Sequence, residues 1–405
     1  MAMQTFISAL ALPIASKDGT TLGKMITYRD ENLEGRKLVY NIGDTSPKAL
    51  LIYEKTIKSP WDAISIALIL VITNFLGDRY EEAYRNQAVL ASRFIDYAQK
   101  EARWVLPALR TVILDLRQLA SLAHQLSTGD NKKSDALEDA ARICNKAFTT
   151  CLLDRANKLP ESRKWGTYQA VGHVLKCYFK VQKTALSKNI LRSLEVQELP
   201  SLSEYPKSDQ VTCRYLFGLL KFLNEEYAQA HNDLSAALDL CHYAAKRNIE
   251  LILRYLVPVR LLRGTFPSTY LLSQFPQLQQ LYTPFINAIR TGDVKQYDNA
   301  LLWAERRLVD EKVYLCVEKA REVCMRSFLR KVWRASSKPT RLPVSTVHKA
   351  LRLVGPSDVL AEEAECIVAN MIYRGYVRGY ISHEKQMIVL AAKDTFPSLQ
   401  WRAGV

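Results

Sequence analysis

Apolar side chains recur along most of the chain at the three- and four-residue spacing that buries one face of a helix. Near the C-terminus this spacing holds from Leu360 to Ile372, while Glu362, Glu363 and Glu365 occupy the opposite face. Gly375 follows, and a residue without Cβ readily adopts the left-handed conformation that ends a helix. The pattern therefore predicts a helix that starts near Asp358 and stops at Gly375.

Beyond Gly375 the period of the pattern changes to two. Tyr376, Arg378 and Tyr380 are expected on one face and Val377, Gly379 and Ile381 on the other, followed by a polar turn over residues 382–385 and a return strand over residues 387–391. The spacing predicts two helices upstream, over residues 318–334 and 345–355, with Pro356 preventing continuation of the second. Three helices closed by a hairpin predict a winged helix, a module used for binding nucleic acids or for pairing proteins.

The remaining chain shows an internal repeat. "FLGDRYEEA" at residues 75–83 and "FLNEEYAQA" at residues 222–230 share Phe, Leu, Tyr and Ala at equal offsets, and a weaker copy covers residues 168–191. In the second copy Gly218, Ala230, Leu234 and Ala237 have the small-residue spacing of a tetratricopeptide-like hairpin, in which two helices cross closely. We therefore predict an all-α dominated fold, a helical-repeat solenoid that a C-terminal winged helix caps.

Composition limits the function classes. The chain has 405 residues, 48% of them hydrophobic, and its longest apolar run, at residues 63–72, is too short to span a bilayer and predicts a buried helix. The opening residues lack a basic lead, so we expect no secretory signal and place the protein in the nucleus, also in the cytoplasm. The eight cysteines show no zinc-binding spacing, and the pattern favours buried reduced thiols. Cys241 beside His242 is the nearest approach to a nucleophile and base, but adjacent helical side chains point apart. The sequence also shows no glycine-rich phosphate loop and no H-x-H metal pair. We therefore predict no enzyme, no metal site and no cofactor.

Several segments resemble the PCI domain, which is named for the proteasome lid, the COP-nine signalosome and initiation factor three. They start at Trp104 ("WVLPALRTVILDLRQLA"), Ser162 ("SRKWGTYQAVGHVLKCYFKVQK"), Lys246 ("KRNIELILRYLVPVRLLRG") and Ala364 ("AECIVANMIYRGYVRGYISHEKQMIVL"). The resemblance is to the branch that holds the fungal signalosome-associated subunit twelve and the mRNA-export PCI protein of transcription-export complex two, and it covers residues 61–399.

The resemblance implies a non-catalytic scaffold. Members of this branch pair through their winged helices with a second PCI protein of the Sac-three type and hold a small, acidic, disordered protein of the Sem-one type, forming a platform for transcription elongation, mRNA splicing or export. The alternative is an accessory, purely protein-binding subunit of a signalosome-like assembly. The expected domains are an N-terminal arm of uncertain fold at 1–58, N-terminal repeats at 59–205, the PCI repeats at 206–316, the winged helix at 317–394 and a tail at 395–405.

Charge points to an anionic partner independently of the resemblance. The net charge is +15 and the isoelectric point about 9.3. From Arg321 to Arg352 nine basic residues stand against one acid, Glu322, so contact with RNA or DNA backbone is expected there, although each cation alone is also consistent with a solvated surface. The predicted nucleic-acid-binding residues are Arg330, Lys331, Arg334, Lys338, Arg341, Lys349, Arg352, Arg374, Arg378 and Lys385.

The helix before the hairpin argues against sequence-specific reading of a duplex, because its three glutamates would face phosphates. On the hairpin, Arg378 and the tyrosines have the chemistry for stacking on single strands, although tyrosines on a half-buried hairpin also serve as packing. A terminal hairpin is further expected to leave an edge strand open to a partner's strand. The predicted partner-binding residues are Tyr376, Tyr380, Ile388 and Leu390.

Overall fold

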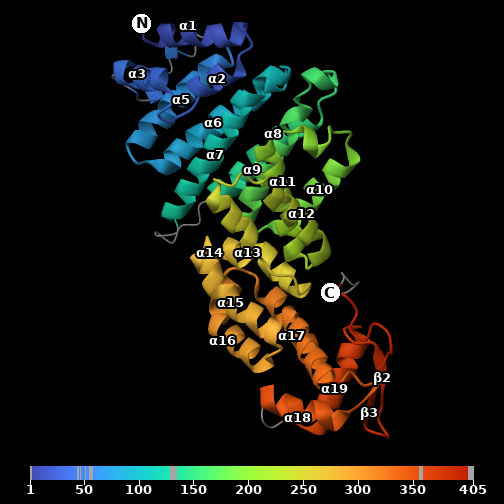
Figure 1. Cartoon of the computed structure of the whole chain (residues 1–405). Helices are drawn as coiled ribbons and strands as arrows, with labels where there is room; N and C mark the ends of the chain where they lie inside the picture. The colour runs from blue at the N-terminus through green and yellow to red at the C-terminus, as the bar shows by residue number, and fades with distance from the viewer. Residues whose placement is uncertain are drawn as a thin grey trace. The chain divides into compact units, whose positions relative to one another are not determined.

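The computed structural model describes residues 2–42, 45, 47–50, 52–53, 58–127, 135–354 and 359–399 (Figure 1). The chain forms two compact units, Met1–Leu216 and Phe217–Val405. Helices dominate both units, and the described strands form one small sheet in the second. The predicted fold class, helical repeats followed by a winged helix, is confirmed.

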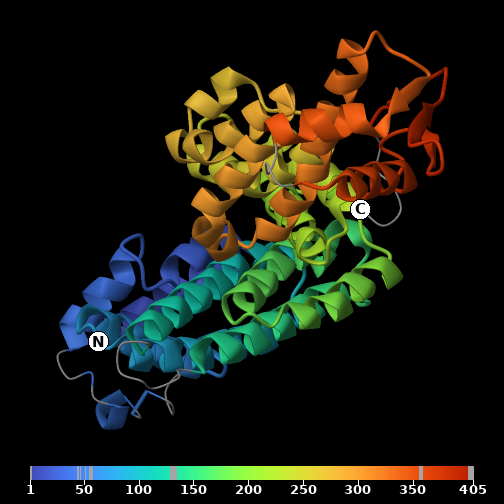
Figure 2. The ribbon, with the colours of Figure 1, turned by 90° about the horizontal axis from the view of Figure 1, so that it is seen from below.

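The first unit is built from helices that pack against their neighbours in sequence. Its helices are α1 (Ala2–Ala15), α2 (Gly19–Met25), α3 (Leu33–Ile42), α4 (Pro47–Leu50), α5 (Trp61–Leu76), α6 (Tyr80–Ala98), α7 (Leu106–Ser127), α8 (Ala136–Leu152), α9 (Thr167–Lys180), α10 (Ser187–Val196) and the first part of α11 (Lys207–Leu223). Figure 2 shows the long helices of this unit lying side by side, and α5 to α9 contact one another in order. The apolar run at 63–72 lies in α5, where Leu68, Ile69 and Val71 are fully buried, as predicted.

The N-terminal arm, to which no fold could be assigned from the sequence, is helical and packs on the repeats. Helix α3 lies against α5, and α2 lies against α7. The fully buried Asp115 of α7 accepts hydrogen bonds from Thr27 Oγ1 at 2.6 Å and Arg29 Nε at 2.8 Å. A buried carboxylate needs such donors to offset its desolvation, so this contact fastens the arm to α7.

The internal repeat has a structural counterpart. In the first copy Phe75 and Tyr80 stack edge to face at 5.7 Å between ring centroids, and in the second copy Phe222 and Tyr227 do so at 5.5 Å. The residue three positions after each phenylalanine is left-handed, with φ of 56° at Asp78 and 63° at Glu225. Equal sequence offsets thus give equal helix turns in both units.

The second unit continues with α12 (Tyr227–Leu240), α13 (Lys246–Leu262), α14 (Thr269–Ser273), α15 (Pro276–Thr291), α16 (Val294–Asp310) and α17 (Tyr314–Ala335). Ala230 is fully buried, and a Cβ added at Gly218 would lie 2.8 Å from Leu234 Cγ. The close helix crossing expected from the small residues is therefore present. Helix α17 packs on α13, α15 and α16 and leads into the winged helix.

The winged helix contains β1 (Arg341–Pro343), α18 (Val344–Val354), α19 (Ala361–Tyr373), β2 (Gly379–Ser382) and β3 (Met387–Leu390). Helix α19 ends as predicted, because Gly375 is left-handed with φ of 70°. The expected starting residue Asp358, and the stop at Gly355 and Pro356, lie outside the described residues.

One detail of the predicted hairpin is wrong. The alternation fails at its start, because Tyr376 N and Val377 N both donate to Met371 O and both side chains are buried, so that β2 begins only at Gly379. Strand β1, which was not predicted, pairs antiparallel with β3 on the side away from β2. The sheet order is therefore β1-β3-β2, and β2 is the strand of the hairpin that lies at an edge of the sheet.

Candidate nucleic-acid and partner interface

A run of cations without acids extends from the end of α17 to the end of α18. We call it the basic segment and define it as Arg330, Lys331, Arg334, Lys338, Arg341, Lys349 and Arg352. All seven side chains are exposed, and no Asp or Glu occurs between Arg330 and Arg352. In the ranges that the structure describes, all of them except Arg352 also lack an ion pair. Six exposed positive charges therefore have no acidic partner among the described residues.

Local structure holds the middle of the basic segment in place. Helix α17 ends in a turn in which Lys338 N donates to Trp333 O at 2.9 Å and the Trp333 indole N–H donates to Pro339 O at 3.0 Å. Strand β1 then starts at Arg341, opposite Val389 of β3. Lys338 and Arg341 consequently project from ordered backbone in the link between the two helices.

The predicted cations in and before the hairpin differ from most of the basic segment in their ion pairs. Arg374 forms an ion pair with Glu322, and Arg378 Nη1 lies 2.9 Å from Asp394 Oδ2. Lys385 is exposed in the turn between β2 and β3. The structure thus gives Arg374 and Arg378 acidic partners within the chain, unlike most of the basic segment.

Two of the nine basic residues from Arg321 to Arg352 make contacts within the chain. Arg321 makes a bidentate ion pair with Asp298, in which Nε donates to Oδ1 at 2.6 Å and Nη2 donates to Oδ2 at 2.8 Å. Arg326 is buried and its Nη2 donates to Phe396 O at 3.1 Å and Pro397 O at 2.7 Å. The segment after β3, predicted as a tail, is therefore held against α17, a contact that no local pattern in the sequence indicated.

Three of the four predicted partner-binding residues lie in the core of the winged helix. Tyr376 is 3% exposed, Ile388 1% and Leu390 6%, whereas Tyr380 is 62% exposed on β2. Burial removes the first three side chains from the surface that a partner can touch. Tyr373, near the end of α19 and 91% exposed, was not predicted and offers a second aromatic side chain on the surface.

The outer face of α19 is acidic. Glu362 and Glu363 are exposed in its first turn. Glu365 is a hydrogen-bond partner of His383 at 2.8 Å, and this hydrogen bond raises the pKa of the His383 imidazole above its usual value. Carboxylates in this position repel phosphates, so the helix that would enter a major groove in a sequence-reading winged helix is unsuited to that task.

The cysteines and candidate ligands give no sign of other chemistry within the ranges described. Six thiols are buried, Cys241 is half-buried and Cys366 is exposed. Three or more His, Cys, Asp or Glu side chains are nowhere grouped so as to hold a metal ion in these ranges. The helices found there are too short or too polar to cross a membrane.

Comparison with known proteins decides the family. The model of the PCI domain matches residues 294–391. "Protein CSN12 homolog" of Mycosarcoma maydis is 41% identical over 353 residues, covering 80% of this chain and 77% of the relative. The chain belongs to the CSN12 family of PCI-domain proteins.

Other relatives align over similar lengths. "Protein CSN12 homolog" of Schizosaccharomyces pombe is 38% identical over 86% of this chain and 85% of its own. "PCI domain-containing protein 2" of Xenopus laevis is 29% identical over 95% of each chain. The family is one of scaffold proteins, and the resemblance noted from the sequence is confirmed.

Proposed function

We propose that this protein is a non-catalytic scaffold whose complex binds the backbone of nucleic acids. It pairs with a second PCI protein of the Sac-three type, holds a small acidic protein of the Sem-one type, and acts in transcription elongation, mRNA processing or export. We place it in the nucleus, with a cytoplasmic pool. The observation that supports the nucleic-acid role is the basic segment, in which six exposed cations have no ion pair with an acid that the structure describes.

The arrangement favours contact with phosphates over contact with bases. Lysine and arginine side chains on a helix end, a turn and an edge strand can follow a charged backbone, and such contacts position a nucleic acid without reading its sequence. The acidic face of α19 argues against insertion into a major groove. We therefore expect binding that depends strongly on salt and weakly on sequence.

The partner surface is proposed on the opposite edge of the sheet. Strand β2 is an outer strand, because β3 occupies the centre, and Tyr380 projects from it. An outer strand offers backbone groups to a partner's strand, and an exposed tyrosine is a common anchor at protein interfaces. Tyr373 adds apolar area at the end of α19.

Charge reversal in the basic segment tests the nucleic-acid role. The variant Lys338→Glu/Arg341→Glu/Lys349→Glu should lose most of its affinity for a single-stranded RNA oligomer, measured by fluorescence anisotropy on the assembled complex over a salt series. Each lost phosphate contact lowers the slope of log K against log salt by about 0.7, so the triple variant should lose about 2 in slope.

The matched control reverses three exposed cations of the first unit, Arg155, Lys188 and Lys207, which have no ion pair with a described acid. It changes net charge equally and should keep RNA affinity. Equal losses in both variants would attribute binding to net charge alone. An unchanged affinity in the first variant would remove the basic segment from the proposal.

A second candidate function is an accessory role in a COP-nine signalosome-like complex, without nucleic acid. The names of the fungal relatives favour it, since they are called CSN12 homologues. Purification of the tagged protein after nuclease treatment, followed by mass spectrometry, separates the two. Signalosome subunits in stoichiometric amounts would support this second role, and a Sac-three-type protein with a small acidic chain would support the first.

A further inference from the structure

The basic segment contains an exposed serine near its centre. Ser337 lies in the turn between α17 and β1, where three cations of the basic segment precede it in the sequence and four follow it. Its hydroxyl has no hydrogen-bond partner among the residues that the structure describes. The hydroxyl group is therefore accessible to an enzyme that modifies it.

The neighbouring hydroxyl residues are held more closely by the fold. Ser336 is half-buried, and its backbone N–H is hydrogen-bonded to the last turn of α17 at 3.0 Å. Thr340 is tied to the sheet, because its carbonyl oxygen accepts a hydrogen bond from the end of β3 at 2.8 Å. Ser345 lies in the first turn of α18. Ser337 differs from these three residues because it combines full exposure with a place in the turn.

The turn at Ser337 contains backbone conformations that an extended chain would relieve. Ser337 and Lys338 have φ of 65° and 56°, a left-handed conformation that residues with a Cβ rarely adopt. Opening the turn breaks the hydrogen bonds from Ser337 N to Arg334 O at 3.2 Å and from Lys338 N to Trp333 O at 2.9 Å. It also releases both residues from the left-handed conformation, which offsets part of that loss. An extended chain is the form in which a protein kinase binds its substrate.

The charges around Ser337 match the chemistry that basophilic kinases recognise. Arg334 stands three residues before Ser337, is exposed and has no ion pair with a described acid. A kinase of this class binds such an arginine with carboxylates in its cleft, and bidentate pairs of guanidinium and carboxylate are among the strongest polar contacts of side chains. Since no Asp or Glu occurs between Arg330 and Arg352, this stretch carries no acid that would repel those carboxylates.

We propose that Ser337 is a phosphorylation site and that a phosphate there releases nucleic acid from the basic segment. The proposal rests on the nucleic-acid role of the proposed function and adds its regulation. A basophilic kinase transfers the γ-phosphoryl group of ATP to the serine. The bond between the γ-phosphorus and the β–γ bridging oxygen breaks, the bond between Ser337 Oγ and phosphorus forms, ADP leaves, and the hydroxyl proton passes to the solvent.

A phosphate at Ser337 acts on the basic segment through its charge. Phosphoserine carries about −1.5 to −2 charges at pH 7 and pairs with arginine, so it offsets about two of the cations that flank it. The loss of two contacts with single-stranded RNA lowers the slope of log K against log salt by about 1.4. Between about 1 M and about 0.1 M salt, this difference in slope corresponds to a loss of affinity of about 25-fold.

The binding experiment compares three forms of the full chain in its assembled complex. These are the wild type, Ser337→Ala, and a chain with phosphoserine incorporated at position 337 during synthesis. Fluorescence anisotropy with a single-stranded RNA oligomer should give equal affinities for the first two forms and about 25-fold weaker binding for the third at about 0.1 M salt. All three forms should melt at the same temperature. A lower melting temperature of the phosphorylated form alone would attribute its loss of affinity to unfolding and overturn the charge mechanism.

The kinase experiment tests recognition of the site by itself. The wild-type complex is incubated with Mg-ATP and a purified calmodulin-dependent protein kinase, a class that prefers arginine three residues before the serine. Mass spectrometry should find one phosphate on Ser337, and Ser337→Ala should lack it. Arg334→Gln should slow the reaction, because it removes the charge that the kinase cleft binds. A wild-type chain that stays unmodified at Ser337 would overturn the site.

Ser203 is the matched control for both experiments. It is exposed in the first unit, in the link before α11, and the residue three positions before it is Pro200. Phosphoserine incorporated at position 203 changes the net charge equally and should leave RNA affinity as in the wild type, and the kinase should not modify Ser203. Equal losses of affinity for the two phosphorylated chains would attribute the effect to net charge and overturn the switch.

The outcomes separate the switch from the proposed function. Unchanged RNA affinity with phosphoserine at position 337, in a complex that loses affinity on charge reversal of the basic segment, would overturn the switch and leave the proposed function standing. No RNA binding by the unmodified complex would overturn the proposed function and the switch with it. Weaker binding with phosphoserine at position 337 but not at position 203 would support both.

Discussion

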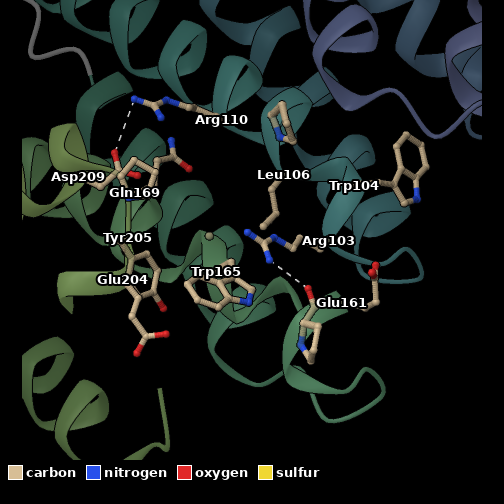
Figure 3. Close-up of a pocket in the computed structure, with 14 residues that line it drawn as sticks. Arg103, Trp104, Leu106, Arg110, Glu161, Trp165, Gln169, Glu204, Tyr205 and Asp209 are labelled. Carbon is tan, nitrogen blue, oxygen red and sulfur yellow. Dashed lines mark hydrogen bonds and ion pairs between the residues drawn. The ribbon is translucent and has the colours of Figure 1, made fainter. Parts of the chain in front are cut away.

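Replacing Asp154 by asparagine tests whether a buried carboxylate fastens the link between α8 and α9. Asp154 Oδ2 accepts from Arg163 N at 2.8 Å and from Ser162 Oγ at 2.9 Å, and Oδ1 accepts from Arg163 Nη2 at 3.1 Å. Arg163 also donates to Glu101 O, in the link before α7. Because this link carries Trp165, the contact also supports the packing of Trp165 on Tyr205, with 5.3 Å between ring centroids (Figure 3).

The expected loss follows from burial. The side chains of Asp154 and Arg163 are 0% and 6% exposed, and removing one partner of a buried ion pair costs about 3 to 5 kcal/mol. Asparagine keeps the shape and one acceptor, so we expect the lower end, about 3 kcal/mol. In a unit of this size each kcal/mol shifts the melting temperature by about 2 to 4 °C, giving a drop of about 6 to 12 °C.

The pH dependence supplies a second signature. Burial alone would raise the pKa of the Asp154 carboxyl, but the hydrogen bonds from Arg163 N, Ser162 and Asn157 and the charge of Arg163 outweigh it, and the pKa is lowered. A folded-state pKa below the unfolded one means that the unfolded chain binds the proton first. The carboxylate therefore stabilises the fold above its usual pKa of about 4, and this contribution is lost as the pH falls through the lower folded value. The gap between wild type and Asp154→Asn should be full at neutral pH and close in acid.

Thermal unfolding followed by circular dichroism between neutral and acidic pH measures this gap, and hydrogen exchange over residues 154–170 reports the link itself. Asp96→Asn is the matched control, because Asp96 pairs with Lys146 at 2.6 Å on the surface and exposed pairs contribute about 1 kcal/mol or less. A melting temperature for Asp154→Asn equal to that of the control at neutral pH would refute the reasoning.

Two further predictions concern the second unit. Ala230→Trp should lower the melting temperature by several degrees, because overpacking a buried site costs about 1 to 3 kcal/mol or more. Gln229→Trp, on the exposed neighbour, should leave the melting temperature unchanged. Equal melting curves for the two variants would mean that the helix crossing is loose. Arg326→Ala should release the segment after β3, because it removes the donor to Phe396 O and Pro397 O. Faster hydrogen exchange over residues 392–399 would show this release. Unchanged exchange would assign the anchoring of the segment to the packing of Trp333 on Phe396.

The parts of the fold that local patterns control were predictable. Helix α19 and its stop depend on apolar spacing and on one left-handed glycine, Gly375, and both are present. The equal turns at Asp78 and Glu225 likewise follow from equal local sequences. In each case the interactions that decide the structure lie within a few residues of one another.

The parts that depend on distant contacts were not predictable. Strand β1 has three residues, one of them Pro343, and becomes a strand only by pairing with β3 more than forty residues later. The N-terminal arm is held by Asp115, far along the chain from Thr27 and Arg29. The excess of basic residues was visible from the sequence, but only the structure shows that Arg326 and Arg374, outside the basic segment, make contacts within the chain. Trp165 and Tyr205 pack on each other from links before different helices, so no single stretch of sequence indicates their contact.

The central position of β3 has a consequence for the order in which the protein matures. Strands β1 and β2 both obtain their hydrogen bonds from Met387–Leu390. During synthesis the first unit can fold while the ribosome is still translating, since domains generally fold in the order in which they emerge. The sheet of the winged helix cannot close until β3 has left the ribosome. A nascent or prematurely terminated chain therefore presents the repeats without a sheet in which β2 is paired. If a partner binds at the β2 edge, as proposed above, it would bind completed chains only.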